Sequence, residues 1–127
     1  MNYQIFWEER GAVAVFKGKL AMSDLIEYQK ELQGDDRYDS LDYVIADYQQ
    51  ADTTQIEQQD REVSLGLTIG ASYSLPSLRL AIVSTDSDTT NFAKYRIAKF
   101  KEYGINWEMR IFSTLTDARK WVGAAAH

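Results

Sequence analysis

The sequence is poor in several residue types that build reactive sites. Its 127 residues include no cysteine, one proline and one histidine. Without cysteine the chain can form no disulfide, no thiolate metal site and no cysteine nucleophile. The histidine, His127, stands at the C-terminal end, where we expect a frayed segment. We therefore predict no histidine general base, no Ser-His-Asp triad, no zinc site and no cofactor.

Long apolar runs are also missing from the sequence. No run reaches the roughly 18 residues that a membrane-spanning helix needs. Residues 1–9 lack the basic and apolar regions of a secretion signal. We therefore expect a cytoplasmic protein that does not insert into membranes.

Basic residues are fewer than acidic residues, 14 against 19, which gives a net charge of −5. Because nucleic-acid binding needs a basic surface, we expect no nucleic-acid partner. One predicted helix nevertheless carries a basic cluster, formed by Lys94, Arg96, Lys99 and Lys101. On a helix these side chains point in several directions, so we interpret the cluster as a solvated exterior and not as a phosphate-binding stripe.

The order of the apolar patterns predicts a single α/β domain over residues 1–127. Residues 3–7 and 12–16 are extended runs joined by a turn at Gly11, which predicts an antiparallel pair. Helical and extended patterns then alternate to the C-terminus. The predicted helices cover residues 23–33, 54–71, 91–103 and 114–122, and the later strands cover residues 41–47, 78–84 and 107–111. The predicted order is therefore β-β-α-β-α-β-α-β-α.

Hydroxyl side chains typical of an N-cap open three of the predicted helices. Ser23 precedes the first helix and Thr114 the last. Thr54 and Glu57 have the spacing of a capping box, in which the threonine oxygen accepts a backbone N–H and the glutamate reaches back to the cap. The second helix is therefore predicted to begin near Thr54. Residues 85–90 are rich in Asp, Ser and Thr and predict a loop.

Four segments carry a resemblance to a known family. They are residues 13–18 (Val-Ala-Val-Phe-Lys-Gly), 43–47 (Tyr-Val-Ile-Ala-Asp), 78–83 (Leu-Arg-Leu-Ala-Ile-Val) and 110–121, which holds Arg-Ile-Phe and Asp-Ala-Arg-Lys-Trp. Through these segments, which are spread over most of the chain, the sequence resembles the STAS-like, or SpoIIAA-like, small α/β domains of bacteria. The resemblance implies a mixed sheet with helices packed mainly on one face. It also implies a non-catalytic regulatory module that acts through protein partners, and we expect a homodimer.

The same resemblance singles out one polar segment. Anti-sigma-factor antagonists of the family carry Asp-Ser-Ser-Gly at the start of the helix after the third strand, and the second hydroxyl residue accepts phosphate. Here Asp52, Thr53 and Thr54 occupy the similar place. They are therefore the candidate phosphoacceptor and partner-docking segment, with Thr54 as the acceptor. Gln55 replaces the family's glycine, and the capping box alone also explains the segment.

Three further acidic residues follow the buried-strand patterns: Asp47, Asp86 and Asp88. Carboxyl ends of neighbouring parallel strands border one crevice, so Asp47, Asp52 and Asp86 are candidates for a weak magnesium or calcium site. Residues 86–90 are similar to the loop of haloacid-dehalogenase-type phosphotransferases, and Asp47 to the acceptor of receiver domains. Both families use companion residues that this chain lacks. A divalent-metal phosphotransfer enzyme is therefore our last alternative, behind plain strand-end and capping roles.

Small residues four apart mark the second predicted helix. Gly66 and Gly70 permit close packing of that helix against a neighbour, or leave room for an apolar ligand, with Tyr73 nearby. Gly66, Gly70 and Tyr73 are therefore a candidate apolar pocket. A carrier of a small apolar ligand or lipid is the alternative to the regulatory module.

Overall fold

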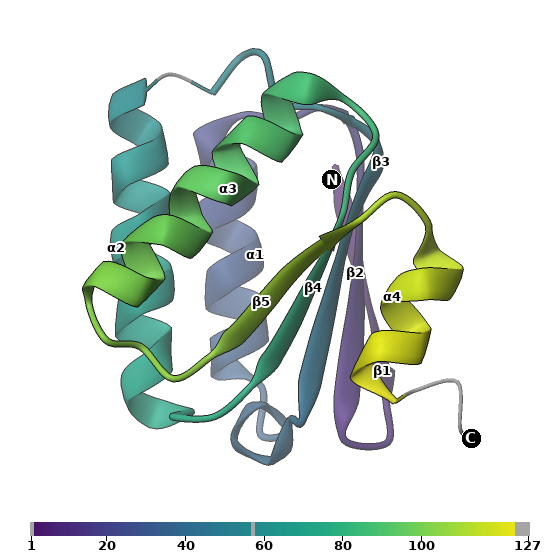
Figure 1. Ribbon diagram of the computed structural model, residues 1–127, viewed down its shortest axis with the longest axis vertical. Coiled ribbons are helices and arrows are strands. Elements are labelled where there is room, and N and C mark those ends of the chain that lie inside the picture. The colour runs from purple at the N-terminus through teal and green to yellow at the C-terminus, as the bar shows by residue number, and fades with distance from the viewer. Residues whose placement is uncertain (1, 57, 124–127) are drawn as a thin grey trace.

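In the computed structural model, which describes residues 2–56 and 58–123, strands and helices alternate along most of the chain (Figure 1). The strands are β1 (Tyr3–Glu8), β2 (Gly11–Lys19), β3 (Tyr43–Asp52), β4 (Arg79–Val83) and β5 (Glu108–Phe112). The helices are α1 (Met22–Gly34), the short 3-10 helix η1 (Tyr38–Ser40), α2 (Gln58–Ser74), α3 (Ser87–Glu102) and α4 (Leu115–Val122). The predicted order of elements is confirmed, apart from the added η1.

The strands form one mixed sheet in the order β1-β2-β3-β4-β5. β1 runs antiparallel to β2, whereas β2, β3, β4 and β5 run parallel to one another. Helices α1, α2 and α3 cover one face of the sheet, and α4 lies on the other face (Figure 1). The predicted α/β class, with a mixed sheet and helices mainly on one face, is confirmed.

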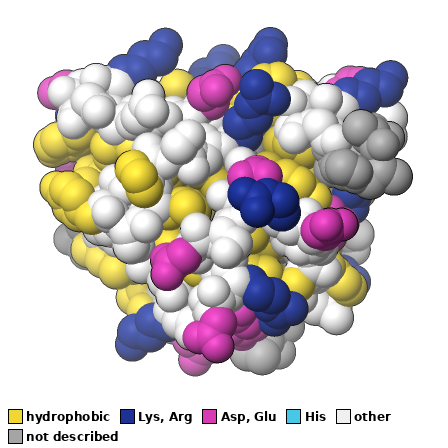
Figure 2. All heavy atoms as spheres, turned by 90° about the horizontal axis from the view of Figure 1, so that it is seen from below, with side chains coloured by type: hydrophobic (Ala, Val, Ile, Leu, Met, Phe, Trp, Pro, Cys, Tyr) yellow, Lys and Arg dark blue, Asp and Glu magenta, His cyan; other side chains and the backbone are white. Residues whose placement is uncertain are grey.

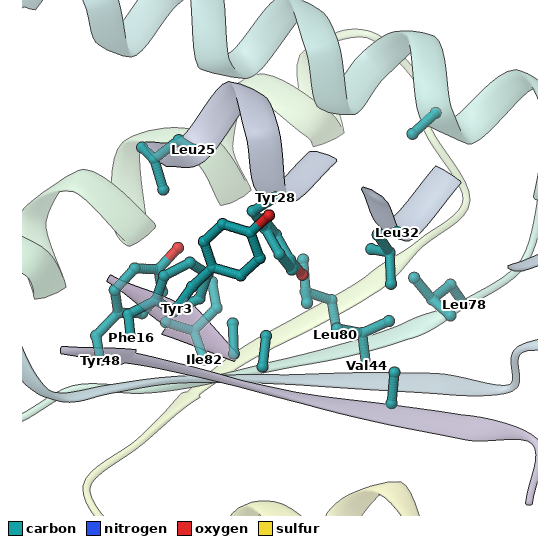
Figure 3. Packing of buried hydrophobic residues seen from close by; sticks show 14 of the residues in the cluster. Tyr3, Phe16, Leu25, Tyr28, Leu32, Val44, Tyr48, Leu78, Leu80 and Ile82 are labelled. Carbon is teal, nitrogen blue, oxygen red and sulfur yellow. The ribbon is translucent and has the colours of Figure 1, made fainter. Parts of the chain in front are cut away.

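The central strands are apolar along their length because they are buried on both faces. Val44 and Ala46 of β3 belong to the larger core cluster, whereas Tyr43 and Ile45 belong to a smaller one on the other face. Figure 3 shows the larger cluster, in which side chains of α1 descend onto those of the sheet. The space between the sheet and the three helices is therefore the main core.

Two helices begin earlier than the sequence predicts. α1 begins at Met22, where the Asp24 carboxylate accepts the Ala21 N–H at 2.8 Å, so Ser23 is not the N-cap. α3 begins at Ser87 because Asp86 is its N-cap, and the predicted loop over residues 85–90 is wrong beyond Asp86. For α4 the prediction is confirmed, with Thr114 as the N-cap.

The capping box predicted at Thr54 is wrong. β3 continues to Asp52, and α2 begins only at Gln58. Thr54 lies in a turn between them, where its backbone N–H donates to Oδ1 of Asp52 at 2.9 Å and its hydroxyl donates to the same oxygen at 2.5 Å. Thr54 therefore belongs to a local turn that its hydrogen bonds to Asp52 stabilise, and it does not begin a helix. Glu57, and the predicted frayed end with His127, lie outside the described residues.

Candidate functional site

The acidic residues at the carboxyl side of the sheet are each engaged locally. Asp47 is buried inside β3, not at its end, and accepts the Gln49 N–H at 3.0 Å. Asp86 accepts the Thr89 N–H at 2.9 Å as the cap of α3, and Asp88 is exposed in the first turn of that helix. Among the side chains that the structure describes, no group of three or more acidic or histidine residues could hold a metal ion.

The segment Asp52 to Thr54 joins two elements of the fold. Thr53 is buried, and its hydroxyl shares a 2.9 Å hydrogen bond with the buried Thr89 hydroxyl of α3. Thr54 is exposed, and its hydroxyl helps to lower the pKa of Asp52 by donating to that carboxylate. Since α2 does not begin here, Thr54 has no helix N-terminus to stabilise a phosphate. The structure therefore leaves Thr54 accessible, but not at a helix start, where the family resemblance places the phosphoacceptor.

The candidate apolar pocket on α2 lies on its outer side. Gly66 and Gly70 are exposed, and a methyl group placed on either would meet nothing within 4 Å. Tyr73 is 84% exposed and lies with Tyr103 at a shallow surface hollow of about 280 Å³. These residues therefore line no part of the core cavity described below.

The molecular surface mixes charges of both signs. Figure 2 shows the lower face, where Lys and Arg side chains stand among Asp and Glu side chains and apolar side chains gather toward the left. Lys94 and Lys101 of the basic cluster are exposed, as predicted. Arg96 is not: only 7% of it is exposed, so the interpretation of a solvated exterior is wrong for this residue.

Arg96 points from α3 toward α2 and the core. Its Nη2 donates to Oγ1 of Thr68 at 2.9 Å, and Gln29 Nε2 reaches the same oxygen at 3.4 Å. The guanidinium also lies 5.7 Å from the Phe92 ring. Its Nε is buried and has no hydrogen-bond partner among the described residues. Among the side chains that the structure describes, no carboxylate forms an ion pair with Arg96.

Arg96 lines a cavity between the three helices and the sheet. The cavity has a volume of about 30 Å³. Its polar lining consists of Arg96, Tyr28, Tyr48, Gln29 and Thr68. The rest is mostly apolar and is formed by Leu25, Leu32, Tyr38, Val44, Ala46, Leu78, Leu80, Ile82 and Trp107. The cavity therefore has one cationic wall, and none of the described residues that line it is a carboxylate.

Local structure places the two tyrosines against this cavity. Tyr28 follows Leu25 by three residues on α1, so both face the sheet. Tyr48 lies where the register between β2 and β3 shifts, and it stacks on Phe16 with ring centroids 4.5 Å apart. Tyr28 meets the Phe16 ring edge-on at 5.0 Å. Figure 3 shows these aromatic side chains between α1 and the sheet.

The electrostatics of the cavity favour an anion. Burial raises the pKa of both Tyr28 and Tyr48, while the Arg96 charge opposes the increase. Both phenols therefore stay neutral at physiological pH and can donate hydrogen bonds. The guanidinium carries a full positive charge under the same conditions. An anion that entered would meet one cation and hydrogen-bond donors, and no negative side chain among the lining residues that the structure describes.

The sequence contained one signal for this site. Phe92, Arg96 and Phe100 recur every four residues, so Arg96 falls on the buried stripe of α3. A charged residue on such a stripe indicates a buried charge. The cavity itself had no signal, because α1, α2 and α3 contribute to it from distant parts of the chain.

In comparisons with known proteins, no family model matches the sequence, and no curated protein matches it. The family resemblance in the strand and helix segments therefore stays a prediction. Within the described residues, no helix is long and apolar enough to cross a membrane.

Proposed function

We propose that this chain is a non-catalytic binding domain whose core cavity takes a small organic anion, with its charged group at Arg96. The observation that carries the proposal is a buried guanidinium with an unpartnered Nε at the wall of a cavity. The proposal combines the non-catalytic module and the apolar-ligand carrier, and moves the binding site from the outer side of α2 to the core.

A buried charge is costly unless hydrogen bonds and an opposite charge compensate it. Thr68 and the Phe92 ring compensate Arg96 in part. A carboxylate would supply the missing negative charge and accept from Nε, because its two oxygens match the planar guanidinium. This pairing supports a carboxylate as the charged group of the ligand.

The rest of the cavity lining limits the size of the ligand. A volume of about 30 Å³ exceeds what one water molecule needs, about 15 Å³, but holds few non-hydrogen atoms. Aliphatic side chains such as Leu25, Leu80 and Ile82 surround that space. The preferred ligand is therefore a short-chain monocarboxylate, and a longer chain would require the helices to move apart. The described lining residues offer donors and apolar contacts, and none of them is an acidic or histidine side chain that could act as a general base.

The experiment is a thermal unfolding series at constant ionic strength with straight-chain monocarboxylates from formate to octanoate. The matching alcohols serve as ligand controls. Binding at 100 times Kd adds about 2.7 kcal/mol to the free energy of unfolding, which raises Tm by roughly 10 °C in a domain of this size. We expect short carboxylates to raise Tm and alcohols to leave it unchanged.

Two variants locate the binding. Arg96→Met removes the cation and should abolish the carboxylate response, whereas Lys94→Met removes an exposed cation of the same helix and should retain it. An equal response in Arg96→Met and the parent protein would contradict the proposal. So would the absence of any response across the whole series.

The regulatory role implied by the family resemblance is a second candidate, favoured by the exposure of Thr54. It predicts a covalent phosphate on Thr54 in protein purified from its own cells, detected by mass spectrometry and lost in Thr54→Val. The adjacent Asp52 carboxylate opposes this modification, because two negative charges would then share one turn. Unmodified Thr54 under all growth conditions would contradict this candidate.

A further inference from the structure

The β5 edge of the sheet is open. Among the described residues, β5 pairs with β4 alone, and it is the last strand in the sheet order. The Glu108 N–H donates to the Leu78 carbonyl, and the Phe112 carbonyl accepts the Ser84 N–H. Because backbone groups alternate in direction along a strand, those of Met109 and Ile111 face the open side.

A groove follows this edge, with a mostly apolar lining that also includes Lys101, Glu108 and Arg110. It is about 310 Å³ in volume. Ile97 and Trp107 line it from the face that α1, α2 and α3 cover, and Trp121 lines it from the α4 face. Met109 lies half-buried along it. Open backbone groups between apolar walls are the features that bind an added strand. The edge therefore offers both hydrogen bonds and apolar surface to a partner.

We propose that the β5 edge binds the β5 edge of a second copy in antiparallel orientation, so that one sheet continues through both copies. A twofold axis passes between the two Met109 residues. Each Glu108 then lies opposite Arg110 of the other copy, and each Trp107 lies opposite Ile111. Residues that lie opposite one another share a face of the sheet in this register.

Charge selects this register among the neighbouring ones. An axis at Arg110 would place two arginines directly opposite each other, and an axis at Glu108 would do the same with two glutamates, which is unfavourable. Only the axis at Met109 pairs opposite charges on both sides. The charges of the edge are therefore complementary to a second copy of the same edge.

Neither charge has a strong partner within one copy. Glu108 is 3.7 Å from the Arg79 Nε, and both side chains are largely exposed. Arg110 has no ion pair among the described residues and lies over the Phe112 and Trp121 rings, at 5.7 and 5.8 Å. Both charges are free to pair across the axis. The opposing interpretation is that they protect a solitary edge from pairing, as charged edge residues often do.

Sedimentation velocity on the full chain distinguishes the two interpretations. Over a micromolar to submillimolar concentration range we expect a reversible dimer. Glu108→Arg or Arg110→Glu alone places like charges opposite each other twice per dimer, and each should raise the dimer Kd by about tenfold or more. The double variant Glu108→Arg/Arg110→Glu restores the complementary pairs and should restore the parent Kd.

Each other result overturns the proposal. A monomer at every concentration would show that the edge charges act as protection. A dimer that tolerates both single reversals would place the interface elsewhere, and a double variant without rescue would exclude the Met109 axis. All three substituted chains should keep the parent circular dichroism spectrum, because both side chains are exposed. The carboxylate response at Arg96 is a separate measurement and does not enter this test.

Discussion

Replacing Arg96 by methionine should stabilise the ligand-free domain, which is the opposite of the usual effect of changing a buried residue. Arg96 is only 7% exposed and has no carboxylate partner among the described residues. Desolvating an ion costs several kcal/mol in a protein. Methionine has a similar reach and is flexible enough to fill the space among apolar neighbours.

The magnitude follows from what the substitution removes and adds. The charged hydrogen bond to Thr68 contributes about 1.5–3 kcal/mol, and the contact with the Phe92 ring about 1 kcal/mol. Removing the desolvation cost and burying an apolar side chain outweigh these losses. Replacements of buried ionic groups by apolar ones yield up to about 4 kcal/mol. We expect a gain of about 1–3 kcal/mol in the free energy of unfolding.

Urea unfolding of the parent, Arg96→Met and Lys94→Met measures this gain. Lys94 is exposed on the same helix, so its variant should stay within about 0.5 kcal/mol of the parent. Arg96→Lys keeps the charge and should bring no gain. A fall of 2 kcal/mol or more in the free energy of unfolding of Arg96→Met would contradict this prediction. Arg96 would then stabilise the ligand-free fold, as an ordinary buried residue does.

Two further predictions concern the sheet and its surroundings. The hydrogen bond from Arg119 lowers the pKa of Glu8, so the pair stabilises the fold above the ordinary glutamate range and loses that effect as the pH falls through the lowered pKa. Glu8→Gln should therefore cost about 1 kcal/mol at pH 7 and almost nothing near pH 2, and an equal cost at both pH values would contradict the assignment. A methyl group on Gly11 would overlap the buried Tyr43 ring, whereas one on Gly66 meets open space. In urea unfolding, Gly11→Ala should cost about 1–3 kcal/mol and Gly66→Ala should gain about 0.5–1 kcal/mol; the reverse order would contradict the packing.

Much of the fold was predictable because burial leaves a direct trace in the sequence. The apolar runs of β3 and β4 indicate strands buried on both faces, and the structure confirms them. The start of α2 was not predictable in the same way. Thr54 can hydrogen-bond either to a following helix or to the preceding Asp52, and the structure shows the second arrangement. Both options are local, so the sequence pattern alone does not distinguish them.

The candidate site was harder to predict than the fold. The sequence predicts Asp47 at a strand end and Asp86 in a loop, whereas Asp47 lies inside β3 and Asp86 is the N-cap of α3. The cavity depends on how three helices meet over the sheet, which no single segment encodes. Arg96 was misread because charged residues are rarely buried without a partner. That rarity is also the reason for assigning it a ligand.

An NMR titration of the arginine Nε–H signals with butyrate would detect a carboxylate at Arg96 itself. The account predicts that the Arg96 signal is protected from solvent exchange and shifts to a saturable end point, because the carboxylate accepts from that N–H. Exposed arginines such as Arg10 should shift little. An Arg96 signal that stays in place at saturating butyrate, or arginine signals that all shift alike, would contradict a carboxylate site in the core.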